Sequence, residues 1–267
     1  MGLKLRTTYV ADFSKLVEGY KPADLASPRR STVPLLAFWA NPDSRFRKLA
    51  ADIGLDPSEP AEFCFEFPVQ VQQGEGKASF TDLMIVSSSF AVAIEGKYTE
   101  PAYETVEKWL RKPSLENRKA VLGGWLSLIQ RATGVHLDVA QIAEQPYQLI
   151  HRTASACFPK VKRRWVIYQL FSEDDRDYYL NHLSDLHHLL GRQGSLSFGV
   201  LLSPLKKSAE YSETEARWDR GERDLSREVC AGLLSGTLFE FNDVRFIKVD
   251  QNVAVEVARQ EPHDDRI

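Results

Sequence analysis

The sequence predicts an α/β fold in which a mixed central sheet, built on an antiparallel three-strand meander, is flanked by helices. Three neighbouring segments alternate in polarity and are rich in Phe and Val, which is typical of strands joined by short turns. Further along, strand-like segments alternate with helical patterns, as in sheets covered on both faces. Of the 267 residues, 43% are hydrophobic, so the chain can bury a core and disorder of the whole chain is excluded.

Residues 1–60 are predicted to form a helical lead-in to an α/β domain over residues 61–250. This part of the chain is dotted with prolines. Two short helices are expected between the prolines, over residues 11–19 and 44–53, and Gly54 can end the second one.

The predicted meander strands cover residues 62–72, 77–87 and 90–99. Pro68, inside the first of them, indicates a sheet edge or a bulge.

The second half of the chain is expected to alternate helices and strands. Its charged segment, residues 206–224, is interpreted as an exposed excursion, and residues 251–267 as a disordered tail. The remaining elements are helices over 102–112, 117–133, 147–158, 177–190 and 226–235, and strands over 164–171, 196–203 and, once or twice, 237–249.

Charge and cysteine usage narrow the class of protein. A net charge of −3 excludes a basic nucleic-acid coat protein but leaves open an enzyme with a local basic footprint. No run approaches the roughly 18 consecutive apolar residues of a membrane span, so no membrane partner is expected. Three scattered cysteines, Cys64, Cys157 and Cys230, form no disulfide framework, and we expect a cytoplasmic protein.

The third meander strand carries the most informative pattern. Because side chains alternate across a strand, Glu95 and Lys97 share one face with the small residues Ala91 and Ala93. Burying a carboxylate and an ammonium in a central strand is costly unless something compensates their lost hydration.

The preceding strand supplies a second carboxylate. If Ser88 and Ser89 form a two-residue hairpin loop, Asp82 lies opposite Glu95, with Cβ atoms about 4.5–5.5 Å apart. Two carboxylates this close repel each other, but a divalent cation between them would make the pair a binding site. Mg²⁺ or Mn²⁺ prefers such oxygens. Lys97 can then help position or deprotonate water, which predicts metal-assisted phosphodiester hydrolysis. A structural salt bridge on a half-exposed sheet is the alternative.

The segment TDLMIVSSSFAVAIEGK resembles the PD-(D/E)XK, or restriction-endonuclease-like, nuclease superfamily, whose signature is an Asp on one strand and Glu-x-Lys on the next. Asp82, Glu95 and Lys97 match these positions, and Thr81 stands where the signature often has Pro. A longer stretch, including EGKYTEPAYETVEKWL and PYQLIHRTASA, is similar to an uncharacterised bacterial family assigned to that superfamily. This similarity spans most of residues 30–205.

The resemblance implies a restriction-endonuclease-like core and a Mg²⁺- or Mn²⁺-dependent endonuclease acting on DNA, in defence or mobile-element processing, with a homodimer as a further expectation. Such enzymes often add an upstream acidic residue to the metal site, for which Glu66 or Glu18 is available. A solvated edge charge is the alternative for both. A Gln on the helix after Glu-x-Lys often helps arrange such sites, and Gln148 matches it.

Two further groups of residues are candidates for substrate binding. His151 and Arg152 share a helical stripe with Gln148, where Arg152 can contact a phosphate and His151 can act as an acid or support a metal ligand. Polar contacts with the sheet are an equally good interpretation of this stripe. Lys162 and Arg163 belong to a basic run that either follows a nucleic-acid backbone or forms an ordinary exposed loop.

The sequence therefore predicts a Mg²⁺-dependent nuclease with Asp82, Glu95, Lys97 and Gln148 as its catalytic residues. The alternative is a non-catalytic nucleic-acid- or protein-binding module on the same fold.

Overall fold

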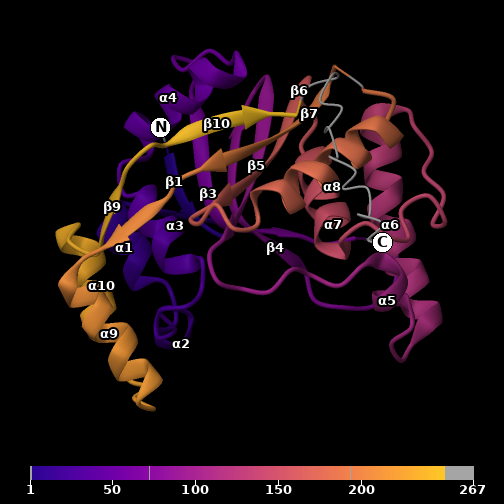
Figure 1. Cartoon of the computed structure of the whole chain (residues 1–267). Coiled ribbons are helices and arrows are strands. Elements are labelled where there is room, and N and C mark those ends of the chain that lie inside the picture. Colours follow the sequence, from indigo (N-terminus) through magenta and orange to yellow (C-terminus); the bar gives the residue numbers. More distant parts are fainter. Residues whose placement is uncertain (1, 72, 193, 250–267) are drawn as a thin grey trace, which may run out of the picture.

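The computed structural model describes residues 2–71, 73–192 and 194–249. Within these residues, an eight-stranded mixed sheet has the strand order β10-β7-β6-β5-β4-β3-β1-β2, and helices cover both of its faces (Figure 1). This confirms the predicted mixed α/β architecture with a central sheet flanked by helices.

The elements follow in chain order. The strands of the large sheet are β1 (Gly2–Leu5), β2 (Thr8–Val10), β3 (Ala61–Val69), β4 (Ser79–Ser87), β5 (Phe90–Lys97), β6 (Arg163–Leu170), β7 (Leu196–Leu202) and β10 (Arg245–Lys248). A small second sheet pairs β8 (Leu205–Lys207) with β9 (Phe239–Phe241). The helices are α1 (Phe13–Glu18), α2 (Pro22–Leu25), α3 (Thr32–Phe38), α4 (Pro42–Ile53), α5 (Val106–Leu110), α6 (Leu115–Thr133), α7 (Tyr147–Cys157), α8 (Arg176–Leu189), α9 (Ala209–Asp219) and α10 (Ser226–Ser235).

The predicted meander is present as β3, β4 and β5, which pair in antiparallel fashion. Leu83 pairs with Ile94 and Val86 with Ala91, so the register is the one expected from a Ser88-Ser89 loop. The two strands that follow extend the sheet in parallel: β6 pairs with β5, and β7 pairs with β6.

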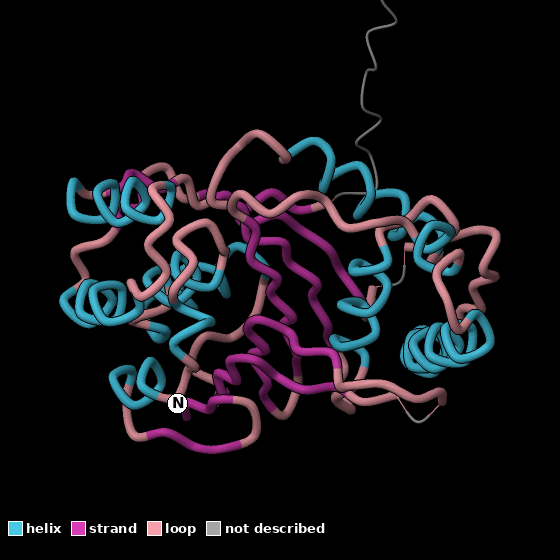
Figure 2. The backbone as a smooth tube through the Cα atoms, turned by 90° about the horizontal axis from the view of Figure 1, so that it is seen from below, coloured by secondary structure: helices cyan, strands magenta, loops and turns pink. Residues whose placement is uncertain are grey.

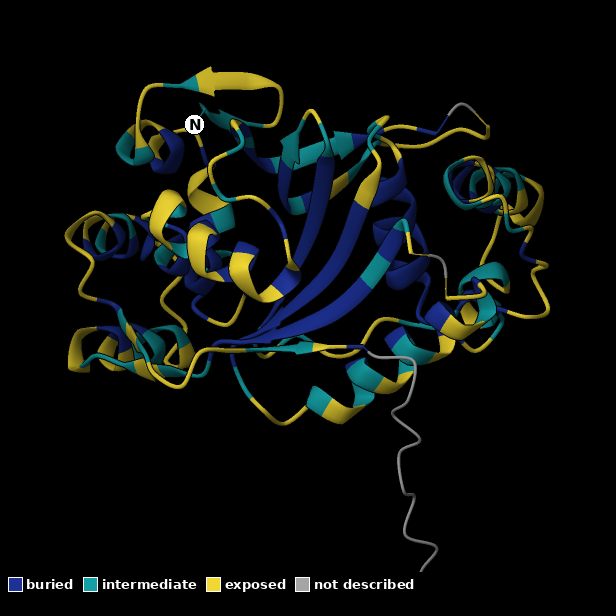
Figure 3. Ribbon diagram, turned by 90° about the horizontal axis from the view of Figure 1, so that it is seen from above, coloured by how far each residue is buried: buried dark blue, intermediate teal, exposed yellow. Residues whose placement is uncertain are grey.

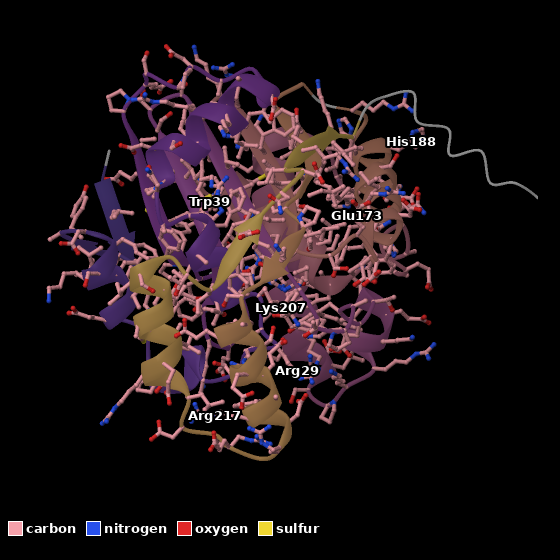
Figure 4. All side chains as sticks on the ribbon, turned by 60° about the vertical axis from the view of Figure 1, so that its left-hand side comes forward. Arg29, Trp39, Glu173, His188, Lys207 and Arg217 are labelled. Carbon is pink, nitrogen blue, oxygen red and sulfur yellow. The ribbon has the colours of Figure 1, made fainter. Side chains whose placement is uncertain are left out.

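Helices lie on both sides of the sheet in Figure 2, and most of the central strands are buried in Figure 3. Two apolar cores lie on opposite faces of this sheet. On one face α5 to α8 pack against β4 to β7, and on the other α1 to α4, α9 and α10 cover the same sheet. Trp39, labelled in Figure 4, joins the end of α3 to the sheet, because its Nε1 donates to Gln169 Oε1 over 2.8 Å.

The first 60 residues contribute more than the predicted helical lead-in. Two helices are confirmed in α1 and α4, and Gly54 ends α4 in the left-handed conformation, with φ at 67°. However, β1 precedes them and pairs in parallel with β3. The N-terminal segment is thus part of the main sheet.

The segment over residues 206–224, expected to be an exposed excursion, is largely exposed but not irregular, because β8 and α9 form there. Ser208 caps α9 by accepting from the Tyr211 amide, and the buried Tyr211 donates its hydroxyl to Pro28 O over 2.7 Å. The high charge of this segment concealed a narrow buried face. The predicted tail, residues 251–267, lies outside the described residues.

None of the described helices is both long and apolar enough to cross a membrane.

Candidate active site

A cavity of about 740 Å³ opens where β4 and β5 meet the start of α3 and one face of α7. Five of the predicted site residues line it: Asp82, Glu95, Lys97, Gln148 and Arg152. The structure thus brings together residues that are up to seventy positions apart in the chain.

Glu95 is the centre of the hydrogen bonds at this cavity. Its Oε1 accepts from Gln148 Nε2 and lies 3.4 Å from Lys97 Nζ, and its Oε2 accepts from Arg152 Nε. The Glu95 side chain is only 5% exposed. A carboxylate this deeply buried needs such partners, because it has lost most of its hydration.

Arg152 holds Glu95 and is itself held by β4. Its Nη1 donates to Ser79 Oγ over 3.0 Å and to Thr81 Oγ1 over 3.5 Å. Burial lowers the pKa of Arg152, but the negative charges of Glu95 and Asp82 outweigh burial and raise it. Arg152 therefore stays cationic, and its bonded nitrogens serve to position Glu95.

His151 lies behind Arg152 and does not line the cavity. Its Nδ1 is 3.1 Å from Ser79 Oγ and 3.4 Å from Arg152 Nη1; since arginine can only donate, Nδ1 accepts there. Burial, together with the charge of Arg152, holds the pKa of His151 well below its usual range. A neutral, buried imidazole suits packing and positioning, and the structure does not place it as an acid at the cavity.

Asp82 lines the cavity, but the prediction that it lies directly opposite Glu95 on the same face of the sheet is wrong. The β4–β5 ladder ends at Leu83 and Ile94, and Asp82 Oδ2 accepts from the Gly96 amide over 2.9 Å. The same oxygen is 3.5 Å from where a Cβ on Gly96 would lie, on the α3 side of β5. Because neighbouring side chains alternate, Glu95 points to the opposite, α7 side. The two carboxylates approach the cavity from either side of the Gly96 peptide.

A left-handed residue in β3 explains this arrangement. Glu66 has φ at 51°, and the antiparallel pairing is interrupted there between the pairs Phe65–Leu83 and Phe67–Thr81. On one side of the interruption, Phe65 and Leu83 pack under α3 and α4. On the other side, Phe67 and Thr81 point to the opposite face of the sheet: Phe67 packs on the core of α6 and α7, and Thr81 contacts Arg152. The alternation of side chains between the two faces of the sheet is therefore reversed at Glu66 in β3 and at Asp82 in β4.

Pro68 follows this interruption, where β1 no longer pairs with β3. The expectation of an edge or a bulge at Pro68 agrees with this geometry, because a proline has no amide to donate to a neighbouring strand.

Two acidic residues at or near the cavity, Asp82 and Glu66, are destabilised in their charged forms. Burial and the charge of Glu95 raise the pKa of Asp82 well above its usual range. Burial raises the pKa of Glu66 to about 7. Carboxylates in this condition are suited to a positively charged partner, which would restore their ionised forms.

The donor set fits a hard divalent cation held through two carboxylates. Asp82 and Glu95 offer oxygens at one cavity, and Mg²⁺ often binds through one or two carboxylates, with water and substrate phosphate completing its shell. Glu66 is not among the residues that line this cavity. The described part of the chain holds no group of three or more His, Cys, Asp or Glu side chains placed to hold a metal. Of the three predicted metal ligands, Asp82 and Glu95 line the cavity.

Lys162 and Arg163 lie at the other end of the sheet from the cavity. Phe90 pairs with Arg163 and Lys97 with Leu170, so the basic run is seven residues away along the strands, roughly 23 Å. Arg163 Nη1 donates to Gly54 O over 2.8 Å. The structure does not bring these two residues to the site.

Several cavity residues were not predicted from the sequence. Ser31 and Arg30 come from the segment before α3, and Tyr103, 46% exposed, comes from the loop after β5. Glu100 ties these segments together, since it accepts from the Ser31 amide over 2.6 Å and from the Tyr98 amide over 3.0 Å. No local pattern marks Ser31, because its neighbours in the sequence only lead into a helix.

The fold and the cavity define an α/β protein with a mixed sheet covered on both faces and a charged cavity at the ends of two central strands. The chain belongs to the family described as "Domain of unknown function (DUF6946)", whose model matches residues 10–209. The cavity lies entirely within this range. No curated protein and no solved structure matches the chain.

Proposed function

We propose that the protein is a metal-dependent nuclease of the restriction-endonuclease-like class that hydrolyses phosphodiester bonds in DNA. The observation that carries the proposal is the meeting of Asp82, Glu95 and Lys97 at one cavity on neighbouring strands. They come from the second and third strands of a meander, which α7 and the parallel strand β6 follow, an order typical of that superfamily.

Asp82 and Glu95 would hold the cation, and Mg²⁺ bound there would lower the pKa of a water molecule and polarise a phosphoryl oxygen. Gln148 and Arg152 keep Glu95 in place through hydrogen bonds. Preorganised ligands of this kind cost no rearrangement when the substrate arrives.

Lys97 supplies the cationic side chain closest to Glu95 on its own strand. Its Nζ is 3.4 Å from Glu95 Oε1, and the side chain is 9% exposed. From this position the ammonium can orient the attacking water and offset negative charge that builds up on the phosphoryl oxygens.

Plasmid and oligonucleotide digestion with Mg²⁺ or Mn²⁺ tests the proposal. We expect cleavage that a chelator abolishes and that Lys97→Met slows by at least roughly 100-fold. Lys119→Ala is the matched control, because Lys119 is exposed on α6 and lies outside the cavity. Cleavage at full rate by Lys97→Met would refute the assignment.

A second candidate is a non-catalytic nucleic-acid- or protein-binding module. It is favoured by the two cationic side chains, Lys97 and Arg152, that already neutralise Glu95. Calorimetry with Mg²⁺ separates the candidates: the nuclease binds the ion, and Asp82→Asn weakens that binding. The binding module takes up no ion and binds DNA or protein equally well with Asp82→Asn.

Light scattering of the same samples tests the proposed homodimer.

A further inference from the structure

A second cavity, of about 630 Å³, lies between α4 and β10 and shares no lining residue with the candidate active site. One wall comes from the end of α3 and the exposed side of α4, and the other from β9, β10 and the turn between them. The second wall lies beyond residue 209, where the family match ends.

Arg45 projects from α4 into this cavity, where two aromatic rings lie close to its guanidinium group. Its guanidinium carbon lies 4.2 Å from the ring centroid of Phe38 and 5.7 Å from that of Phe241. Its Nε donates to Phe38 O over 3.1 Å. Arg45 is half-buried, so its charge has lost part of its hydration, and this lowers its pKa.

In the described part of the chain, the terminal nitrogens of Arg45 have no hydrogen-bond partner. Among residues 2–71, 73–192 and 194–249, no carboxylate forms an ion pair with Arg45 and no oxygen accepts from its Nη atoms. The bond to Phe38 O accounts for Nε alone. Two terminal nitrogens of a half-buried cation thus remain available for an anion, and an arginine fork matches phosphate oxygens in geometry.

Further charges line the same cavity. Lys48, one turn along α4 from Arg45, forms no ion pair with any described residue. Across the opening, Arg245 Nη2 pairs with Glu173 over 2.8 Å; Glu173 is labelled in Figure 4. Asp52 and Asp243 add carboxylates that can accept from hydroxyl or amino groups.

We propose that this cavity binds a nucleoside phosphate. The phosphate would lie between Arg45 and Lys48, and the base would pack on the ring of Phe241 or Phe246. The carboxylates of Asp52 and Asp243 suit the ribose hydroxyls or the amino groups of a base, which an inorganic anion does not offer. The volume is within the usual range for ligand cavities, about 300–1,000 Å³.

The proposed ligand has two sources, a free mononucleotide or the phosphorylated end of a nucleic-acid strand. Helix α3 connects the two cavities, because Thr32 lines the candidate active site and Phe38 lines this one. Six residues separate them, so the distance along the helix is about 9 Å. The assignment nevertheless rests on Arg45 and its surroundings, and it holds whether or not the first cavity cleaves DNA.

Calorimetric titration of the full chain without divalent metal tests the proposal. The probes are AMP, inorganic phosphate, adenosine and a short 5′-phosphorylated single strand. We expect saturable binding of AMP that is stronger than that of phosphate or adenosine alone. Arg45→Lys keeps the charge but loses the fork, and should weaken binding by about tenfold or more. Lys48→Ala should weaken it roughly threefold.

Arg47→Ala is the matched control, because Arg47 is exposed on the same helix and does not line the cavity. Thermal unfolding confirms that each variant is folded. Binding of AMP alone identifies the free nucleotide as the ligand, and binding of both AMP and the oligonucleotide identifies a strand end. The proposal is overturned if neither binds, if phosphate binds as strongly as AMP, or if Arg45→Lys and Lys48→Ala leave the affinity unchanged.

Discussion

Arg152 and Glu95 form an ion pair across α7 and β5 in which the two side chains are 7% and 5% exposed. Few ion pairs among the described residues are so deeply buried. Each ion depends on the other, because an unpaired buried charge is far more costly than a paired one. This pair fixes the position of the carboxylate at the candidate active site.

Removing the negative charge from this pair should strongly destabilise the protein. Glu95→Gln leaves the Arg152 charge without its carboxylate, and we expect a loss of about 3–5 kcal/mol in the free energy of unfolding. Urea denaturation at neutral pH measures it. As a control, Glu62→Gln breaks the more exposed Lys4–Glu62 pair and should cost less than about 1 kcal/mol. Similar losses for the two variants would contradict a special role of the buried pair.

The pair should also show coupling. The double variant Glu95→Gln, Arg152→Gln removes both charges, so its loss should be smaller than the sum of the two single losses by more than about 1 kcal/mol. Additive losses would mean that the two side chains act independently.

Glu66 should make stability fall as the pH rises. Its pKa is raised from 4.5 to about 7 in the folded protein, so the folded state binds a proton more tightly than the unfolded state. The free energy of unfolding therefore decreases as the pH rises from 4.5 to about 7. Glu66→Gln should remove this decrease, of order 1 kcal/mol, in denaturation curves measured across that range. Glu116→Gln, at an exposed position of α6, should leave the pH profile as it is.

Gly96 is expected to be intolerant of a side chain. A Cβ there would lie 3.3 Å from both Leu35 Cδ1 and Ser31 Cβ, and 3.5 Å from Asp82 Oδ2. Gly96→Ala should push α3 and Asp82 outward and cost about 1–3 kcal/mol. Thermal unfolding tests this, with Gly76→Ala as the control because nothing lies within 4 Å of a Cβ at Gly76. Equal melting temperatures for the two variants would show that α3 and Asp82 can move away from the new Cβ without a loss of stability.

The β4–β5 hairpin loop should loosen in acid. Glu59 accepts from the hydroxyls of Ser87, Ser88 and Ser89 over 2.6–2.8 Å, and these bonds lower the pKa of Glu59 from 4.5 to about 2. The stabilisation is complete above pH 4.5 and is lost as the pH falls toward about 2. The protection of the Ser89 amide, which also donates to Glu59, is the factor by which its hydrogen exchange is slower than that of an unfolded chain at the same pH. It should decrease as the pH falls over that range, and it should be low even at neutral pH in Glu59→Gln. Unchanged protection in Glu59→Gln would argue against this role.

Local patterns in the sequence were sufficient for much of the fold. The alternation of residues 77–87 and 90–99 predicted β4 and β5, and a two-residue serine loop was enough to predict the register that pairs Leu83 with Ile94. The same alternation placed Glu95 and Lys97 on one face. These inferences succeed because strand periodicity and hairpin geometry depend on residues that are close in the chain.

Other features of the site depend on contacts between distant segments. The left-handed Glu66, two residues before the Pro68 where an edge or a bulge was predicted, reverses the faces of β3 and β4 and brings Asp82 beside Gly96. The alternation of the residues does not reveal this reversal. Likewise, the hydrogen bond from Arg152 to Glu95 depends on the packing of α7 on β5, which joins residues far apart in the chain.

The sequence alone thus determined the strands, the hairpin register and the shared face of Glu95 and Lys97. Only the tertiary structure decided which groups reach the cavity: Ser31 enters from the N-terminal helices, while Lys162 and Arg163 lie at the far end of the sheet. The physical reason is that hydration lost on burial is compensated by whichever partners packing brings near, and those partners are set by the whole fold.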